Sequence, residues 1–241
     1  MKGLLRTTAT LLSVAVAGGV GAWILWGSEL TRCHGVEVEG NTRAGAAEVR
    51  HLANVGIGEP LIGVDLDAVV AGVERHPWVA HAEVRRAFPD RVVISVRERV
   101  PTALLLLDQL YLVDAEGNVF RKAAGVSLDL PVLTGIPLEY STEQPDLARR
   151  IIRDGLSILA TASDSARQGE GEIAENAVSE VRFDARAGYT LMLRNGGEVL
   201  LGFEPDAALT RLSRLARKGV DLSLPHRVDL GSPRLAVVTP L

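Results

Sequence analysis

The segment HPWVAHAEVRRAFPDRVVISVRERVPTAL, residues 76–104, decides how the first half of the protein folds. Apolar residues recur at about every second position over 78–86 and again over 92–96, which is the spacing of strands that bury one face. The turn Phe88-Pro89-Asp90 separates the two runs. The segment therefore predicts a β-hairpin with one core face.

Upstream of the hairpin, the sequence predicts one strand and two helices. Residues 36–41 alternate apolar and charged side chains and close with Gly-Asn, which indicates a short, half-buried strand. Residues 46–53 and 66–73 carry apolar residues at helical spacing, and Asp65 is a plausible N-cap for the second helix. The order strand, helix, helix, strand, strand predicts a two-layer domain over residues 34–102.

Downstream, residues 103–241 predict a mixed, mainly antiparallel β domain with two helices, so the fold class is α+β. The helices are expected at 145–160 and 206–218, and a polar loop at 163–176. Asn195-Gly196 is a strong hairpin signal. The strand-like segments are 104–107, 111–113, 118–120, 131–135, 178–183, 189–193, 198–203, 228–230 and 235–238.

The N-terminal segment predicts a single transmembrane helix. Residues 7–28 contain no charged side chain, and at about 1.5 Å per residue they would reach roughly 33 Å as a helix, enough to cross a bilayer core. Lys2 and Arg6 precede this segment, so the tail of residues 1–6 is expected in the cytoplasm. The rest of the chain would then lie on the other side of an inner membrane.

Three other interpretations of this segment fit its residues less well. A cleaved signal peptide would have a shorter apolar core and a small-residue cleavage site, which is missing after Trp26. Lipid attachment at Cys33 would require a small residue before the cysteine, where Arg32 stands. A buried helix of a soluble protein is rarely uncharged over this length. The membrane helix is therefore favoured.

Composition narrows the classes of partner. The chain has 241 residues, a net charge of −4 and 4% aromatic residues, with no basic stripe. This argues against nucleic acid as a partner, because such proteins present basic and stacking surfaces. The single cysteine, Cys33, cannot form an internal disulfide and is interpreted as a bystander thiol.

No catalytic, metal or cofactor site is predicted. The five histidines are scattered outside any H-E-x-x-H frame and are interpreted as surface residues. The sequence has no G-x-S-x-G elbow and no nucleotide-binding glycine loop, and the Asp65/Asp67 pair is explained by helix capping. The protein is therefore not expected to be an enzyme or to take a small-molecule substrate.

The ordered set of residues around the hairpin resembles the POTRA domain of the FtsQ/DivIB family of cell-division proteins. The matching positions are Pro77, Trp78, Val79, Ala82, Val84, Arg86, Phe88, Pro89, Ile94, Val96, Glu98, Arg99, Pro101 and Ala103. The second domain also has its elements in the family's order. The resemblance implies a scaffold of the divisome that links early and late division proteins at the septum. It also implies periplasmic binding to the bitopic proteins FtsB and FtsL, and so regulation of septal peptidoglycan synthesis.

The last strand is the expected partner-binding region, because an exposed strand edge can accept a further strand. The resemblance implies that FtsB binds there and that an Arg lies nearby. The candidate residues are Arg186, Val228, Asp229, Leu230, Leu235, Ala236, Val237 and Val238. Residues 231–233, Gly-Ser-Pro, depart from the family's Arg-Tyr, so an aromatic anchor is missing. The alternative is that this is an ordinary core strand. A Val237→Glu change distinguishes the two, because a core strand would lose folding as well as binding.

Two other functions are alternatives to a division scaffold. A POTRA-containing component of a secretion or outer-membrane assembly system would need many more alternating strands after residue 102. A periplasmic cell-wall enzyme would need a catalytic constellation that this sequence lacks.

Overall fold

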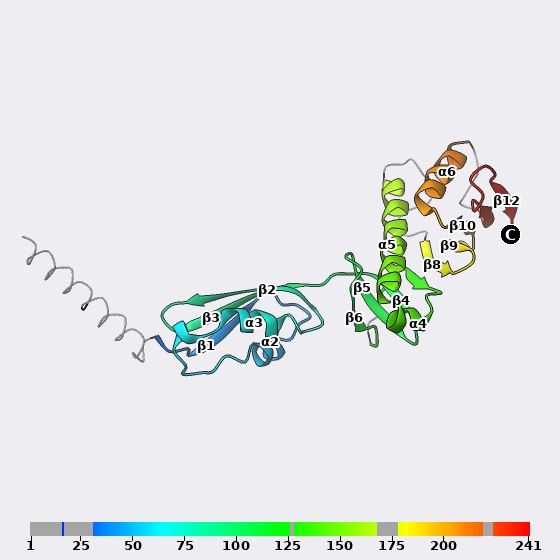
Figure 1. The fold of residues 1–241 in the computed structure, drawn as a ribbon. Coiled ribbons are helices and arrows are strands. Elements are labelled where there is room, and N and C mark those ends of the chain that lie inside the picture. The colour runs from blue at the N-terminus through cyan, green and yellow to red at the C-terminus, as the bar shows by residue number, and fades with distance from the viewer. Residues whose placement is uncertain (1–15, 17–30, 126–127, 168–177, 219–223) are drawn as a thin grey trace, which may run out of the picture. The chain divides into compact units, whose positions relative to one another are not determined.

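The computed structural model describes Val16 and residues 31–125, 128–167, 178–218 and 224–241 (Figure 1). They belong to two compact units, one ending at Arg99 and one beginning at Val100. The expected tail, residues 1–6, and the expected membrane helix, residues 7–28, lie outside the described residues apart from Val16. Within the described ranges, none of the helices combines the length and the apolar character needed to span a bilayer.

Over residues 31–99, the first unit consists of a three-stranded sheet with two α-helices. Its elements are β1 (Gly35–Glu39), α2 (Ala46–Ala53), the 3-10 turn η2 (Leu61–Gly63), α3 (Leu66–Val73), β2 (Val79–Ala87) and β3 (Arg91–Glu98). The strand order is β1-β3-β2, with β1 parallel and β2 antiparallel to the central β3. This confirms the predicted order of strand, helix, helix, strand, strand.

An N-cap determines where α3 begins, and a glycine allows α3 to pack closely against α2. The Asp65 side chain accepts the Ala68 N–H at 3.1 Å, which is the predicted N-cap of α3. A Cβ on Gly72 would lie 2.4 Å from the Leu52 carbonyl oxygen, so α3 packs against α2 at a position where no side chain fits. Val69 and Val73 of α3 are buried.

Glu98 ties the end of β3 to the chain that enters α2. Its carboxylate accepts three backbone N–H bonds of 2.7 Å from residues 42–44. Burial alone would raise the pKa of the Glu98 carboxyl, but these three donors outweigh it and hold the pKa below its usual value. Beside this contact, the Arg43 guanidinium lies 4.7 Å from the centre of the buried Trp78 ring.

In its described residues, the second unit is a nine-stranded sheet with three helices. Its elements are β4 (Pro101–Leu106), β5 (Leu110–Asp114), β6 (Val119–Lys122), β7 (Val132–Thr134), α4 (Leu138–Glu143), α5 (Pro145–Arg167), β8 (Val178–Asp184), β9 (Gly188–Leu193), β10 (Glu198–Gly202), α6 (Pro205–Arg217), β11 (His226–Asp229) and β12 (Val237–Pro240). The strand order is β12-β11-β10-β9-β8-β7-β4-β5-β6. Only β10–β11, β7–β8 and β4–β7 are parallel, so the mainly antiparallel prediction is confirmed.

Three details of the second unit differ from the prediction. The helix α4 was missed because none of its residues is buried, which leaves no apolar stripe to detect. The helix α5 continues to Arg167, so the predicted loop at 163–176 begins too early. The last strand starts at Val237, because residues 231–236 are needed to reverse the chain after β11.

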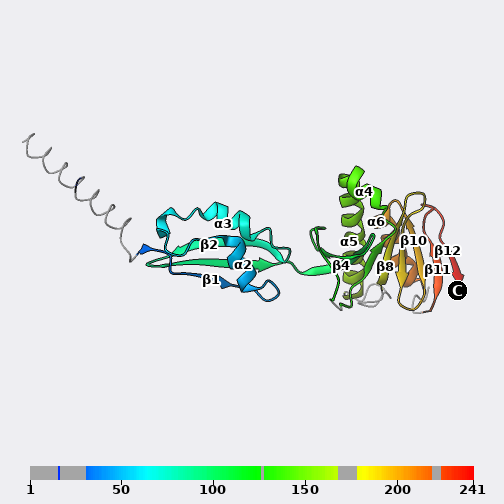
Figure 2. The same cartoon turned by 90° about the horizontal axis from the view of Figure 1, so that it is seen from below.

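The core of the second unit lies between α5, α6 and one face of the sheet (Figure 2). In β9, Tyr189, Leu191 and Leu193 are buried, whereas the residues between them are half-buried, as one-sided burial requires. The Tyr189 hydroxyl donates to the Asp154 carboxylate on α5 at 3.0 Å. Burial and this neighbouring carboxylate raise the pKa of Tyr189.

Candidate functional site

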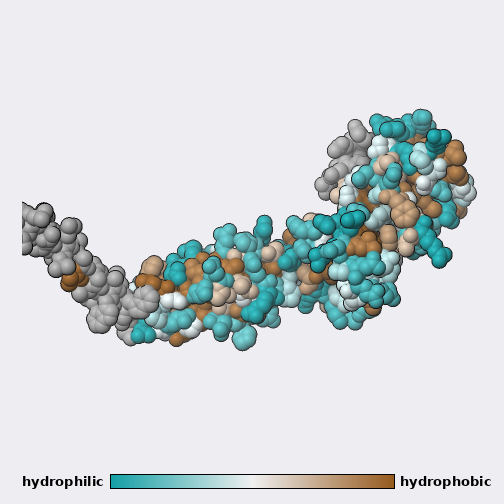
Figure 3. Space-filling model, viewed as in Figure 1, coloured by the Kyte–Doolittle hydropathy of each residue, from teal (hydrophilic) through white to brown (hydrophobic). Residues whose placement is uncertain are grey.

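Among the described strands, β12 forms one edge of the nine-stranded sheet and pairs with β11 alone. All residues from Gly231 to the C-terminal Leu241 are exposed. Val237 and Val238 retain 57% and 37% of their accessible surface. In Figure 3, hydrophobic atoms lie at this end of the second unit, over β12. The sheet therefore ends in an exposed, uncharged strand.

Two hydrogen bonds determine which way the main chain of β11 points. The Leu230 N–H donates to the Leu200 carbonyl of β10 at 2.9 Å, and the Leu241 N–H donates to the Pro225 carbonyl at 3.0 Å. Since successive residues of a strand direct their polar groups to opposite sides, even-numbered residues of β11 face β10 and odd-numbered residues face β12.

The same alternation determines which groups of β12 are free to accept a further strand. Val237 and Thr239 are paired with the odd-numbered residues of β11, so their N–H and C=O groups point into the sheet. The N–H and C=O of Val238 therefore point outward from the edge. Pro240 also points outward but has no N–H, so the row of donors ends there.

The predicted site residues have different environments. Val228 and Leu230 are fully buried, so their side chains belong to the core and cannot contact a partner. Asp229 is exposed, and its carboxylate accepts the Gly231 N–H at 2.9 Å. Leu235 and Ala236 are exposed but precede β12, which corrects the strand predicted at 235–238. Burial could not be assigned from the sequence, because it depends on which face of β11 meets α6.

Arg186 lies in the turn between β8 and β9, at the end of the sheet where β12 begins. A Cβ on Gly188 would lie 2.3 Å from the Gly202 carbonyl, and one on Gly202 would lie 3.3 Å from the Gly231 Cα, so these segments share one end. Three strand spacings of about 4.8 Å, roughly 14 Å, nevertheless separate β9 from β12. Arg186 is therefore near the edge but is not part of it.

A basic hollow beside β12 was not predicted. The Arg211 guanidinium on α6 donates to the carbonyls of Leu230 and Ser232 and so fastens the segment that leads into β12. Between α6 and this segment lies a hollow of about 160 Å³. Its lining residues are Arg211, Arg214, Leu215, Lys218, Pro233, Arg234, Leu235 and Ala236. The positions 211, 214 and 218 share one helical face, a spacing that could have revealed the basic surface.

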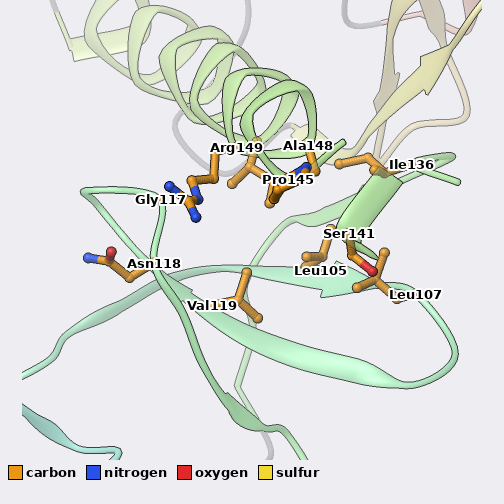
Figure 4. Close-up of a pocket in the computed structure, with 11 residues that line it drawn as sticks. Leu105, Leu107, Gly117, Asn118, Val119, Ile136, Ser141, Pro145, Ala148 and Arg149 are labelled. Carbon is orange, nitrogen blue, oxygen red and sulfur yellow. The ribbon is translucent and has the colours of Figure 1, made fainter. Parts of the chain in front are cut away.

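A larger cleft of about 500 Å³ lies at another place in the second unit (Figure 4). In the close-up, Pro145, Ala148 and Arg149 of α5 face Val119 of β6 across the opening. The lining residues are Leu105, Leu107, Gly117, Asn118, Val119, Ile136, Ser141, Pro145, Ala148, Arg149 and Ile152. Arg149 is the one charged side chain among them, so this cleft offers no acid–base pair.

His76 corrects the expectation that the histidines lie on the surface. It is buried, its Nε2 lies 2.9 Å from a Glu48 carboxylate oxygen, and its Nδ1 accepts the Trp78 N–H at 3.2 Å. Both ring nitrogens therefore serve packing between α2 and β2. In the described ranges, no three His, Cys, Asp or Glu side chains are grouped so that they could hold a metal ion.

Cys33 is buried where the chain enters the first unit. Its Sγ lies 3.6 Å from the Gly35 carbonyl oxygen, and burial raises the pKa of the thiol. A raised pKa keeps the group in the less nucleophilic thiol form, which agrees with a bystander role.

Comparison with known proteins gives matches to both units. Residues 32–99 match the family described as POTRA domain, FtsQ-type, and residues 104–231 match Cell division protein FtsQ/DivIB, C-terminal. The chain is 37% identical to Cell division protein FtsQ of Anaeromyxobacter sp. over 211 residues, covering 86% of this chain and 70% of that protein. It is 35% identical to Cell division protein FtsQ of Myxococcus fulvus over 220 residues, covering 90% and 75%.

Proposed function

Because the chain belongs to the FtsQ/DivIB family of cell-division proteins, we propose that it is a non-catalytic scaffold of the divisome. It binds partner proteins resembling FtsB and FtsL and thereby ties together the proteins that build the septum. Family membership is the observation that separates this function from a secretion or outer-membrane assembly role.

The proposed mode of binding is strand addition at β12. An extended partner segment pairs with the outward N–H and C=O of Val238, and Pro240 limits how far the pairing can extend. The exposed, uncharged surface of β12 supports this mode, because β12 carries no charge and no element within the described ranges covers its outer edge.

The basic hollow gives the partner a second requirement. Arg214, Lys218 and Arg234 line it together with apolar residues, next to the segment that leads into β12. We propose that the partner carries acidic and apolar residues beside its pairing strand. Electrostatic complementarity of this kind favours encounter and fixes register more than it adds raw affinity.

The arrangement in the cell follows from the expected membrane helix at residues 7–28. We propose a single-pass inner-membrane protein with residues 1–6 in the cytoplasm and a POTRA domain at 34–102 outside it. A partner-binding domain at 103–241 completes the periplasmic part. This arrangement puts β12 on the same side of the membrane as the extracytoplasmic parts of FtsB- and FtsL-like proteins.

The deciding experiment changes one outward N–H. In Val238→Pro the ring removes the donor that faces the partner, whereas the bonds from β12 to β11 use residues 237 and 239. We expect full-length protein in nanodiscs to lose binding to its own organism's FtsB- and FtsL-like proteins, with an unchanged melting temperature.

The matched control is Val238→Ala, which keeps the N–H and shortens only the side chain. It should bind within a few-fold of the unchanged protein, as measured by pull-down and biolayer interferometry. Equal binding by the proline and alanine variants would show that the partner does not pair with this edge.

A further inference from the structure

One end of the first unit carries a group of exposed apolar side chains. Ile57, Ile62 and Phe88 keep 68%, 39% and 62% of their accessible surface. Over the described residues 31–99, they are the exposed large apolar side chains of this unit. Single exposed apolar residues are normal, but three from separate segments at one end are less so.

Strand pairing puts Phe88 at the end where the chain enters the unit. Phe88 lies in the turn between β2 and β3, and Gly35 at the start of β1 is paired with Arg91 at the start of β3. The His34 N–H donates to the Asp90 carbonyl within that turn at 2.8 Å. Figure 1 shows this turn beside the beginning of β1.

Hydrogen bonds bring Ile62 to the same end. The Arg86 guanidinium, near the end of β2, donates to the carbonyls of Leu61, Ile62 and Val64. The turn η2 is thereby held against the last residues of β2, so the exposed Ile62 side chain lies close to the β2–β3 turn.

Ile57 belongs to a segment that is bonded directly to the entering chain. The Cys33 N–H donates a hydrogen bond to the Glu59 carbonyl, and the Gly58 N–H donates one to the Cys33 carbonyl, both at 2.8 Å. The Arg32 guanidinium donates to the Gly58 carbonyl at 2.6 Å. Figure 3 shows hydrophobic atoms on the surface at this end, where the described chain begins.

Chain length restricts how far this end can be from a membrane. The expected membrane helix closes at residue 28, and Cys33 is already buried in the unit. Five residues span at most about 17 Å even when fully extended, at roughly 3.3–3.6 Å each. The three apolar side chains are therefore held within reach of the lipid headgroups.

We propose that this end of the first unit seats on the outer surface of the bilayer, with Ile57, Ile62 and Phe88 inserted at the headgroup boundary. The proposal rests on the membrane helix of the proposed function. Seating restricts the tilt of the first unit on its anchor, which a flexible tether alone would not do. Apolar side chains at a membrane boundary bind in proportion to the apolar area they bury.

The charges at this end indicate which force holds the seat. Arg91 lies 3.7 Å from a Glu37 carboxylate oxygen and 3.8 Å from an Asp90 carboxylate oxygen, and the Arg32 and Arg86 guanidinium groups donate to backbone carbonyls. Anionic lipid and low salt should therefore matter little. The seat depends on apolar contact.

The test places an environment-sensitive fluorophore on full-length protein in nanodiscs that contain spin-labelled lipid. Buried Cys33 is changed to Ala, and the label is attached at Phe88→Cys or, as a control, at Arg97→Cys near the other end of β3. We expect several-fold stronger quenching at position 88 than at 97, unchanged in molar salt. Equal quenching at the two positions, or loss of the difference in salt, overturns the proposal.

A second variant separates seating from tethering. Ile57→Ser combined with Ile62→Ser should reduce quenching at position 88 several-fold, because the tether remains but the apolar contact does not. Unchanged quenching would mean that the tether alone explains the proximity. Protein that fails to enter nanodiscs would overturn both the membrane anchor and the seat. Unchanged protein that shows the quenching but binds no FtsB- or FtsL-like partner would overturn only strand addition.

Discussion

The two edges of the nine-stranded sheet are built from strands of equal length but opposite chemistry. The strand β6 reads VFRK and ends in Arg121 and Lys122, whereas β12 reads VVTP and carries no charge. Charged side chains on an edge strand discourage the addition of another strand. One sheet therefore has a protected edge and an open edge, and the open one is the candidate for partner binding.

The strand β12 shows how an edge can be open to a partner without promoting aggregation. In β12 only Val238 directs both of its main-chain groups outward, and Pro240 removes the next donor. A short row of this kind can pair with a partner that supplies further contacts at the basic hollow. Two copies of β12 alone would gain few hydrogen bonds.

Removal of β12 should give the largest effect. A chain ending at Ala236 should lose partner binding by about 100-fold or more, since hot-spot losses of ~3 kcal/mol are typical of a central contact. All four residues of β12 are exposed, so thermal unfolding of the second unit should change much less than binding. A comparable collapse in both measurements would make β12 a core strand.

Val237→Glu should weaken binding about tenfold and should be worse than Val237→Lys. Position 237 is paired with Asp229, so the glutamate adds a like charge directly opposite, whereas the lysine adds an opposite one. Titration calorimetry with both variants and circular dichroism of each checks this order. The reverse order would contradict both the repulsion by Asp229 and the proposal of an acidic partner.

Low pH should reduce the stability of the first unit through Glu98 without acting on β12 itself, because β12 has no titratable side chain. The pKa of Glu98 is lowered on folding, so its stabilisation is fully present above the usual value of 4.5 and is lost as pH falls through the lower folded value. Glu98→Gln should cost about 1 kcal/mol at neutral pH, since the half-exposed site is screened.

Denaturant unfolding at pH 7 and pH 3 checks the Glu98 prediction. The difference between the variant and the unchanged protein should shrink as the pH falls through the lowered pKa of Glu98, because the native carboxyl then becomes protonated as well. A difference that is constant with pH would mean that charge does not carry the contact.

Opening the protected edge should have the smallest effect. Arg121→Thr with Lys122→Val gives β6 an uncharged end and should produce weak, concentration-dependent self-association, visible by sedimentation velocity at high protein concentration. Partner binding at β12 should not change. A variant that stays monomeric would show that the charges of β6 are not what keeps that edge unpaired.

Most of the first unit could be predicted from the sequence, because its strands and helices are determined by local patterns. The period of two in the hairpin and the carboxylate of Asp65 each determine a structure from a few neighbouring residues. The helix α4 has no buried residue, so no periodic signal marks it.

The candidate site was predicted only in outline. The apolar run 235–238 does not reveal that the strand starts at Val237, because the register is set by pairing with β11. The burial of Val228 and the contact of Arg211 with the Leu230 carbonyl are tertiary facts. They depend on the packing of α6, which no local pattern contains.

The parallel pairing of β1 with β3 has a mechanical consequence for the membrane-anchored division scaffold proposed above. The chain enters at the start of β1 and leaves after the end of β3, at Arg99. Tension between the anchor and the second unit would pull these two strands in opposite directions along their length. The five paired positions from Gly35 to Glu39 would then bear the load together in shear, which resists rupture better than peeling them apart one by one.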